Sequence, residues 1–154
     1  MRLREFLRHD FVLLRLEGRD VEGVIAEVAR QAGLAGLGDP DMIRAQLLER
    51  EHVHPTVMGS GLAIPHATVP GLEQPVIGVA LAGGAPVSFG PTDQGAVRVF
   101  FVLLSPPGHE REHVKLLARI CRLVRHEGFI ESLEASKRPD EVVGVIESVD
   151  ALHV

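Results

Sequence analysis

The segment 97–104, Val-Arg-Val-Phe-Phe-Val-Leu-Leu, constrains the fold of this chain more than any other feature of the sequence. Arg98 is its one charged residue, and the others are β-branched, aromatic or leucine. The run is much shorter than the ~20 apolar residues that a membrane-spanning helix needs, and its composition favours a strand. A strand that is apolar at nearly every position is buried within a sheet. We therefore predict that residues 97–104 form a central strand.

Further strands and helices are predicted from the spacing of apolar residues along the rest of the chain. Short apolar runs predict strands over 11–16 and 76–81. Helical spacing predicts helices over 20–33, 39–50 and 113–124, and shorter helices near 130–134 and 141–148. Asp20 and the pair Asp39-Pro40 suit helix starts, whereas Gly33, Gly36 and Gly128 suit helix ends. The segments 52–75 and 83–95 are rich in Gly and Pro, so we expect a structured loop region and a connecting loop there.

Strands that alternate with helices, without internal repeats, indicate an α/β fold: a small mixed sheet flanked by helices. The chain has 154 residues, 45% of them apolar, which suits one globular domain. We therefore expect a single domain over residues 1–154.

Composition excludes several classes of function. The formal net charge is −5, aromatic residues make up 4%, and Trp and Tyr are absent, which argues against nucleic-acid binding. The charged, amphipathic N-terminus does not resemble a secretory signal, and we expect no membrane-embedded segment. A single cysteine, Cys121, in an apolar helical pattern suits a reducing compartment. We expect a cytoplasmic protein without a cofactor.

His66 is the strongest candidate for chemistry, because it follows a short apolar piece and a proline that fixes the backbone, Ala63-Ile64-Pro65. A neutral imidazole has a free nitrogen lone pair near pH 7, so histidine can accept a phosphoryl group reversibly. For a histidine considered alone, the ordinary interpretation is a turn residue bonded to the backbone. Position alone does not decide between the two.

Four other histidines lie near His66 in the sequence. His109 and His113 are four residues apart and would share one helix face, a spacing that can also bind zinc. We treat a metal site as the minority hypothesis and assign no metal ligand. For His52 and His54 we expect solvent-facing loop positions, with a metal cluster that includes His66 as the alternative.

From Arg50 through the run Gly59-Ser60-Gly61-Leu62-Ala63-Ile64-Pro65-His66, the chain resembles the active-site signature of phosphotransferase-system (PTS) enzyme IIA domains of the fructose/mannitol/nitrogen-regulatory class, type 2. The core Ala-Ile-Pro-His is its most specific part. The resemblance continues through Ala85-Pro86-Val87-Ser88-Phe89, the strand that leads to Ser105-Pro106, and Glu112-His113. It therefore covers nearly the whole chain and implies the fold of that family.

The resemblance implies a phosphotransferase in which His66 is the phosphorylated residue. By the same resemblance His113 is the second active-site histidine and Arg50 is an active-site arginine, and both are expected to bind the phosphoryl group. Thr56 matches a threonine near the phosphate. Its neighbours depart from the family, because Pro55-Thr56-Val57 stands where Ser-Thr-Gly is usual, so the loop lacks a hydroxyl and a flexible glycine beside the phosphate.

The resemblance also implies partners. His66 would take its phosphoryl group from the histidine-containing phosphocarrier protein and pass it to an enzyme IIB domain for sugar uptake. The alternative is a stand-alone regulatory protein of the nitrogen-regulatory type, whose phosphorylation state controls binding to regulatory partners. In either case we expect an apolar docking surface around His66, with Leu62 and Val69 as exposed candidates.

Overall fold

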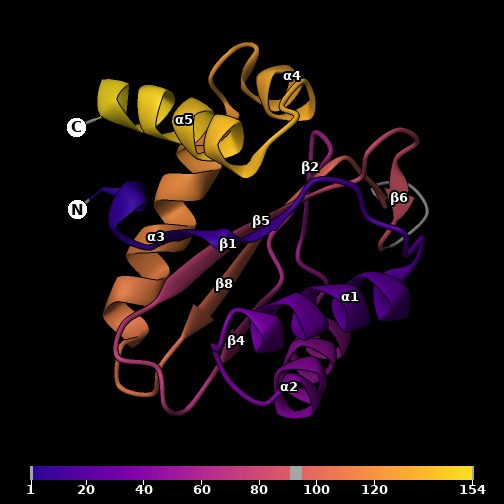
Figure 1. Cartoon of the computed structure of the whole chain (residues 1–154), viewed down its shortest axis with the longest axis vertical. Coiled ribbons are helices and arrows are strands. Elements are labelled where there is room, and N and C mark those ends of the chain that lie inside the picture. Colours follow the sequence, from indigo (N-terminus) through magenta and orange to yellow (C-terminus); the bar gives the residue numbers. More distant parts are fainter. Residues whose placement is uncertain (1, 91–94, 154) are drawn as a thin grey trace.

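The structure, a computed structural model, describes residues 2–90 and 95–153. Its main sheet is mixed, with the strand order β1-β5-β8-β3-β2, and β4 also pairs with β8 (Figure 1). The strands of this sheet are β1 (Leu7–Leu13), β2 (Val57–Gly59), β3 (Leu62–Ala63), β4 (His66–Thr68), β5 (Val76–Leu81) and β8 (Val99–Ser105). A separate two-stranded sheet pairs β6 (Val87–Ser88) with β7 (Ala96–Val97). The mixed sheet and the central place of β8 confirm the predicted fold class.

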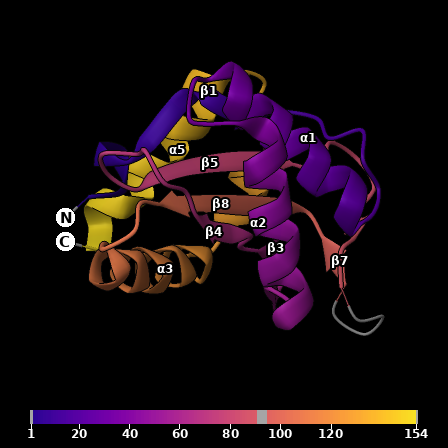
Figure 2. The ribbon, with the colours of Figure 1, turned by 90° about the horizontal axis from the view of Figure 1, so that it is seen from below.

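Helices cover both faces of the main sheet (Figures 1 and 2). One face packs against α1 (Val21–Leu34) and α2 (Pro40–Val53), and the other against α3 (Glu110–Val124), α4 (Phe129–Glu134) and α5 (Pro139–Asp150). Single turns of 3-10 helix, η1 (Leu3–Glu5) and η2 (Ala151–His153), lie near the two ends.

Strand β8 shows why this sequence needs two covering layers. Phe100, Val102 and Leu104 belong to the apolar cluster under α1 and α2. The alternate residues Val99, Phe101 and Leu103 belong to the cluster under α3 to α5. Side chains alternate between the two faces of a strand, so a run that is apolar at every position must be covered on both.

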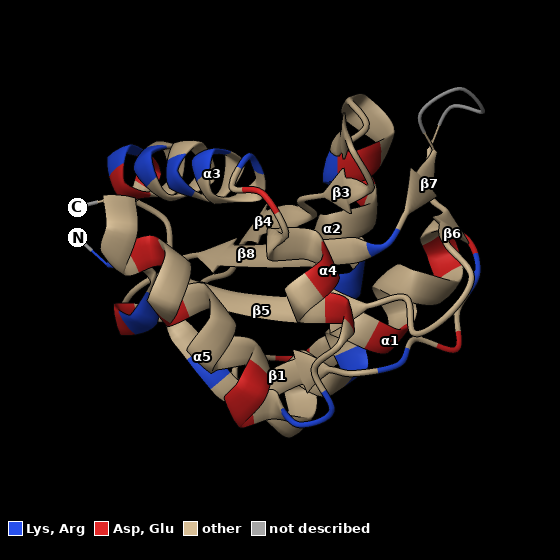
Figure 3. Ribbon diagram, turned by 90° about the horizontal axis from the view of Figure 1, so that it is seen from above, with Lys and Arg blue, Asp and Glu red and all other residues tan. Residues whose placement is uncertain are grey.

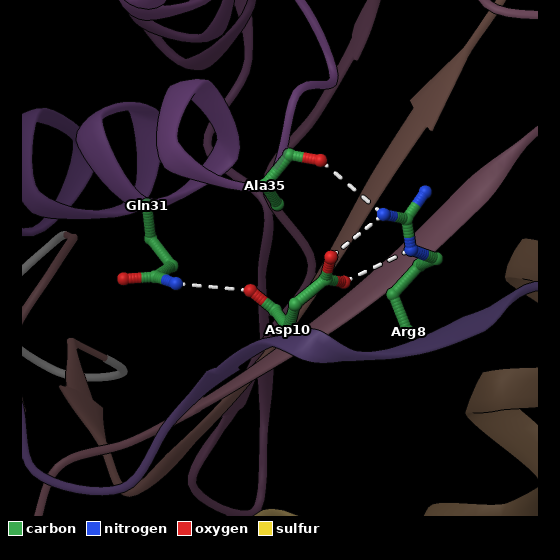
Figure 4. A network of polar contacts seen from close by, with 4 residues as sticks. All are labelled: Arg8, Asp10, Gln31 and Ala35. Atoms are coloured by element: carbon green, nitrogen blue, oxygen red, sulfur yellow. Dashed lines mark hydrogen bonds and ion pairs between the residues drawn. The ribbon is translucent and has the colours of Figure 1, made fainter.

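The first strand lies earlier than its predicted range of 11–16. It starts at Leu7 because β1, at the edge of the sheet, pairs in parallel with β5 from that residue: Leu7 lies opposite Ile77, and after an irregular stretch the pairing resumes with Val12 opposite Val79. The Arg8 guanidinium binds the Asp10 carboxylate and the carbonyl oxygen of Ala35, and Gln31 donates to the carbonyl of Asp10 (Figure 4). These bonds fasten the edge strand to the C-terminal end of α1.

The helices follow the sequence prediction closely. Asp20 caps α1, its carboxylate accepting from the N–H of Gly23, and Asp39 caps α2 with Pro40 in the first turn. Helix α3 begins at Glu110, earlier than predicted. Gly128, expected as its end, instead precedes α4 with a φ of 82°, in the left-handed region that favours glycine.

The ends of the chain meet beside α3, as Figures 1 and 2 show. Asp150, the last residue of α5, accepts a hydrogen bond of 2.8 Å from the backbone N–H of Leu3 and forms an ion pair with Arg119 of α3. The Asp150 side chain is 1% exposed. We call Leu3, Arg119 and Asp150 the terminal clamp.

The structured loop predicted over 52–75 contains three short strands, β2, β3 and β4. Each is two or three residues long, and β3 and β4 pair with β8, which is distant in sequence. Strands that depend on such pairing leave little periodic signal of their own. In the predicted connecting loop 83–95, residues 91–94 lie outside the described residues.

Candidate functional site

Strand β4 fixes the position of His66. The residue before it, Pro65, accepts a hydrogen bond of 3.0 Å from the N–H of Leu103, and Val69, beyond the strand, donates one of 2.8 Å to the carbonyl of Ser105. Both partners belong to the central strand β8. The backbone that carries His66 is therefore held on both sides by the most buried part of the sheet.

The ring of His66 is oriented by its own backbone. Its Nδ1 lies 2.8 Å from the carbonyl oxygen of Ile64. A carbonyl oxygen only accepts, so Nδ1 carries the proton and the neutral ring has its lone pair on Nε2. Burial lowers the pKa of His66, and the nearby Arg50 charge acts in the same direction, although the bond to Ile64 opposes them. The ring is therefore neutral, and Nε2 is nucleophilic, at neutral pH.

His113 faces His66 from the first turns of α3. The two ring centroids are 5.1 Å apart, with an angle of 61° between the ring planes. Nδ1 of His113 lies 2.7 Å from Oγ of Ser105, the last residue of β8. Burial lowers the pKa of His113 to about 4, and repulsion from Arg50, and from His66 when that ring is protonated, acts in the same direction. At neutral pH the site therefore holds two uncharged imidazoles.

These rings line a pocket of about 480 Å³ between the C-terminal turn of α2 and the start of α3. Arg50 enters it from α2, and its guanidinium donates a hydrogen bond of 2.6 Å to the carbonyl of His54. The lining residues are Gln46, Glu49, Arg50, Val53, His66, Ala67, Thr68, Ser105, Pro106, His109, Glu110, His113 and Val114. Three of the four predicted site residues, His66, His113 and Arg50, thus meet around one cavity.

The charges around the pocket favour an anion at its inner end. Arg50 and the two histidines supply one cation and several N–H groups, whereas Glu49 and Glu110 are exposed at the rim. Basic residues recur along α3, which begins at the pocket, although the chain as a whole is acidic (Figure 3). A small dianion would therefore sit beside Arg50 rather than at the rim.

Thr56 lies elsewhere. It is 4% exposed, its hydroxyl donates to Oε1 of Glu51 at 2.8 Å, and its N–H donates to Oε2 of Glu51 at 2.6 Å. It is outside the pocket lining. Burial raises the pKa of the Glu51 carboxyl, against the effect of these two bonds. The observed role of Thr56 is to tie the loop before β2 to the end of α2, next to Arg50, and its predicted contact with phosphate stays a prediction.

The other three histidines near His66 in the sequence, His52, His54 and His109, divide between the rim of the pocket and the solvent. His109, the N-cap residue of α3, lines the pocket, and its Nδ1 lies 2.6 Å from Oε1 of Glu112. The segment His109-Glu110-Arg111-Glu112-His113 has the H-E-x-x-H pattern of zinc-binding helices. Within the described residues, however, no group of three or more His, Cys, Asp or Glu side chains could hold a metal ion. His52 and His54 are exposed.

The sequence prediction that Leu62 and Val69 are exposed docking residues is wrong. Leu62 is 2% exposed and Val69 is fully buried, because both pack in the cores beside β8. Val53 and Val114 are apolar residues that do line the pocket in exposed positions, at 78% and 63% exposed. They lie on the two helices that form the pocket walls, α2 and α3.

Comparison with known proteins identifies the family. Residues 5–149 match the family model described as "Phosphoenolpyruvate-dependent sugar phosphotransferase system, EIIA 2". The chain belongs to this EIIA type 2 family. The earlier resemblance is thereby confirmed, and with it membership of a phosphotransferase system. Within the described residues, no helix of this EIIA chain combines the length and the apolar character that a membrane crossing requires.

The similar proteins include nitrogen regulatory proteins and a sugar-specific enzyme IIA. The chain is 31% identical over 147 residues to a nitrogen regulatory protein of Bradyrhizobium diazoefficiens, a match that covers 95% of each chain. Its fold matches nitrogen regulatory protein IIA-Ntr of Neisseria meningitidis with a TM-score of 0.82 at 23% identity, over 94% of this chain and 98% of the other. It also matches the mannitol enzyme IIA of Escherichia coli, in a complex with phosphorylated enzyme IIB, with a TM-score of 0.76 at 20% identity, over 93% and 99%.

Sequence reasoning missed Ser105. This hydroxyl ends an otherwise apolar strand and is 3% exposed, so its burial contrasts with its polarity. A polar residue at the end of a predicted central strand is a signal in principle. Its partner His113 follows eight residues later on the next helix, and no simple spacing rule joins the two.

Proposed function

We propose that this EIIA protein is a phosphocarrier that takes a phosphoryl group onto Nε2 of His66 and passes it on to another protein. One observation carries the proposal. The bond from Nδ1–H of His66 to the carbonyl of Ile64 leaves the lone pair on Nε2, in a pocket that also contains His113 and Arg50. A nucleophile of fixed tautomer beside a cation and N–H donors suits acceptance of a phosphoryl group.

The transfer needs no metal or nucleotide in the protein. The Nε2 lone pair of His66 attacks the phosphorus of a phosphohistidine on the donor. The new N–P bond forms as the donor's N–P bond breaks, and that electron pair returns to the donor's imidazole. The phosphorylated ring of His66 keeps its Nδ1 proton and becomes positively charged. The Ile64 carbonyl then stabilises this charge through the existing hydrogen bond.

Arg50 and His113 position and stabilise the group in transit. A guanidinium matches the oxygens of a phosphoryl group, and an N–H donor from His113 adds a second contact. Such groups act where negative charge passes between donor and acceptor. Both face the His66 pocket from rigid helices, which favours exact placement over the flexibility of a loop.

We expect the donor to be the histidine-containing phosphocarrier protein and the acceptor an enzyme IIB domain in sugar uptake. The mannitol enzyme IIA of similar fold was solved with phosphorylated enzyme IIB, which supports a IIB partner. Both partners must bring a phosphorylated or acceptor side chain into the pocket. The exposed valines at its rim, Val53 and Val114, would then be covered in each complex.

A regulatory role is the second candidate, and one observation favours it. The nitrogen regulatory protein of Bradyrhizobium diazoefficiens is 31% identical over nearly the full length of both chains. In this role the phosphorylation state of His66 would set the affinity for a regulatory partner. The chemistry at His66 is the same in both candidates, and only the destination differs.

The first experiment is incubation with phosphoenolpyruvate, enzyme I and the phosphocarrier protein, followed by intact mass analysis. Wild type should gain one phosphoryl group, and His66→Ala should gain none. His52→Ala is the matched control, because it removes an exposed histidine outside the pocket lining and should gain the group normally. No gain in wild type with a cognate donor would refute the proposal.

The destination is tested by adding a cognate enzyme IIB to the phosphorylated protein. Loss of the mass gain, with its appearance on IIB, would support sugar uptake. Retention of the phosphoryl group in the presence of IIB would favour the regulatory role. Genes for a permease and IIB beside the gene for this protein would support the transport route independently.

A further inference from the structure

The contact between Ser105 and His113 has a chemical direction that can be worked out from the hydrogen bonds. Oγ of Ser105 lies 2.7 Å from Nδ1 of His113, and Ser105 is 3% exposed. A hydroxyl has one hydrogen to donate, whereas a neutral imidazole nitrogen either donates or accepts. The contact therefore has two possible directions, and they leave opposite tautomers of His113.

Hydrogen-bond satisfaction decides between them. Among the described residues, the Ser105 hydroxyl has no hydrogen-bond partner other than His113. If Nδ1–H of His113 donated to Oγ, the single Ser105 proton would be left buried without an acceptor, which is costly. If Oγ–H donates to Nδ1, both groups are satisfied. The proton of the neutral His113 ring then resides on Nε2.

We propose that Ser105 is a positioning residue that holds His113 in the tautomer protonated on Nε2, so that an uncharged ring presents an N–H donor to the phosphoryl group on His66. This inference rests on the proposed function of His66. It assigns to Ser105 for His113 the same task that the Ile64 carbonyl performs for His66. The two rings are thereby set in opposite tautomers: a lone pair on Nε2 of His66 and a proton on Nε2 of His113.

The opposite tautomers suit the chemistry of the pair. The ring centroids are 5.1 Å apart, so two nucleophilic nitrogens in one small space would compete for the same phosphorus. With a proton on its Nε2, His113 cannot be the acceptor and acts only as a hydrogen-bond donor. Its lowered pKa keeps this ring uncharged at neutral pH, where the choice of tautomer matters.

The Ser105 hydroxyl is also well placed to act without moving. Ser105 is the last residue of β8. The N–H of Leu103 and the carbonyl of Ser105, both in this strand, bond to the backbone on either side of His66. His113 stands on the helix that follows, so one connection from β8 to α3 sets both rings relative to each other. A change of the hydroxyl alone should therefore alter His113 without displacing His66.

The test is nitrogen NMR of the histidine rings, combined with transfer rates from the phosphorylated phosphocarrier protein. In wild type at pH 7.5, the spectrum should show the His113 proton on Nε2 and Nδ1 as an acceptor. Ser105→Ala should give a mixture of tautomers and transfer about tenfold slower, as expected for one lost hydrogen bond. Ser105→Thr keeps the hydroxyl and should stay within about twofold of wild type. Ser148→Ala, an exposed serine on α5, is the control.

A double-mutant cycle separates positioning from a structural role. If Ser105 acts through His113, Ser105→Ala should not slow transfer further in a His113→Ala background. An equal slowing in that background, or a wild-type spectrum with the His113 proton on Nδ1, would overturn the proposal. The spectrum needs no phosphoryl donor. A protein with the expected tautomer that takes up no phosphoryl group would therefore refute the proposed function of His66, and not the tautomer assignment.

Discussion

Helix α3 carries two polar clusters of opposite character. Near its start, His113 faces His66 and bonds to Ser105 beside an open pocket. Further along the same helix, Arg119 pairs with Asp150 in the terminal clamp. In the clamp the carboxylate meets both the guanidinium and the N–H of Leu3. At the pocket, one nitrogen of each ring is bonded within the protein and the other is left for a ligand.

The difference separates groups that serve the fold from groups that serve chemistry. A buried ion pair with its hydrogen bonds complete has little capacity to bind anything else, and removal of one partner is costly. A pair of half-bonded imidazoles costs stability only at acidic pH, where burial opposes their protonation, and it leaves directed lone pairs and N–H groups. The pocket and the terminal clamp should therefore respond differently to mutation.

The largest effect is expected at the clamp. Asp150→Ala leaves Arg119 without its buried partner and the Leu3 N–H without an acceptor. We expect a loss of about 3 kcal/mol in the free energy of unfolding, measured by chemical denaturation. Asp140→Ala is the control, since it breaks an exposed ion pair with Arg138 and should cost less than about 1 kcal/mol. Equal losses in the two variants would show that the clamp is not a stabilising pair.

At the pocket end, His113→Ala should have the reverse profile. Removal of a donor to the transferring group should slow phosphorylation of His66 on the order of 100-fold. The unfolding free energy should fall by about 1 kcal/mol, less than at the clamp, because loss of the half-buried ring leaves one neutral hydroxyl, that of Ser105, without its partner. Stopped-flow or quenched-flow transfer and chemical denaturation measure the two quantities. A variant that transfers at the wild-type rate would remove His113 from the mechanism.

Exposed apolar residues at the two ends offer a matched comparison. Val114, at the pocket, and Leu152, beside the clamp, are 63% and 68% exposed. Val114→Asp places a charge where a partner must dock, so we expect kcat/KM for transfer from the phosphocarrier protein to fall about tenfold. Leu152→Asp should leave transfer unchanged. If both variants transferred equally well, the rim valine would lie outside the docking surface.

Parts of the fold were predictable from the sequence because they repeat a local pattern. Strand β5 matches its predicted range, and the caps Asp20 and Asp39 mark the starts of α1 and α2. The strands β2 to β4 were not predictable in this way, because pairing with the distant β8 creates two of them. The first strand occupies Leu7–Leu13 rather than the predicted 11–16 because it pairs with another distant strand, β5.

In the candidate site, too, some residues were predictable from a local motif and others depended on contacts between distant elements. The motif around His66 pointed to His113 and Arg50, which the fold brings to one pocket. Motif matching could not give the orientation of Thr56, whose hydroxyl turns to Glu51, nor the burial of Leu62 and Val69. Those outcomes depend on which side chains meet across elements. Ser105 was missed for the same reason, because its role depends on a contact between a strand end and a helix.

The smallest expected effect is the pH dependence of stability. The pKa of His113 falls from its ordinary value of 6.5 to about 4 on folding, and that of His66 is also lowered. Below pH 6.5 the unfolded chain therefore binds protons that the folded protein does not, so stability decreases as the pH falls toward 4. For the half-buried His113 we expect a loss on the order of 1 kcal/mol between pH 7.5 and 4.5, after allowance for solvent screening. His113→Ala should lack this part of the loss, and proton NMR should show the His113 ring still neutral at pH 5.5. A ring that titrates near 6.5, with the same pH dependence in both proteins, would mean that the pocket end of α3 is as well solvated as an ordinary surface.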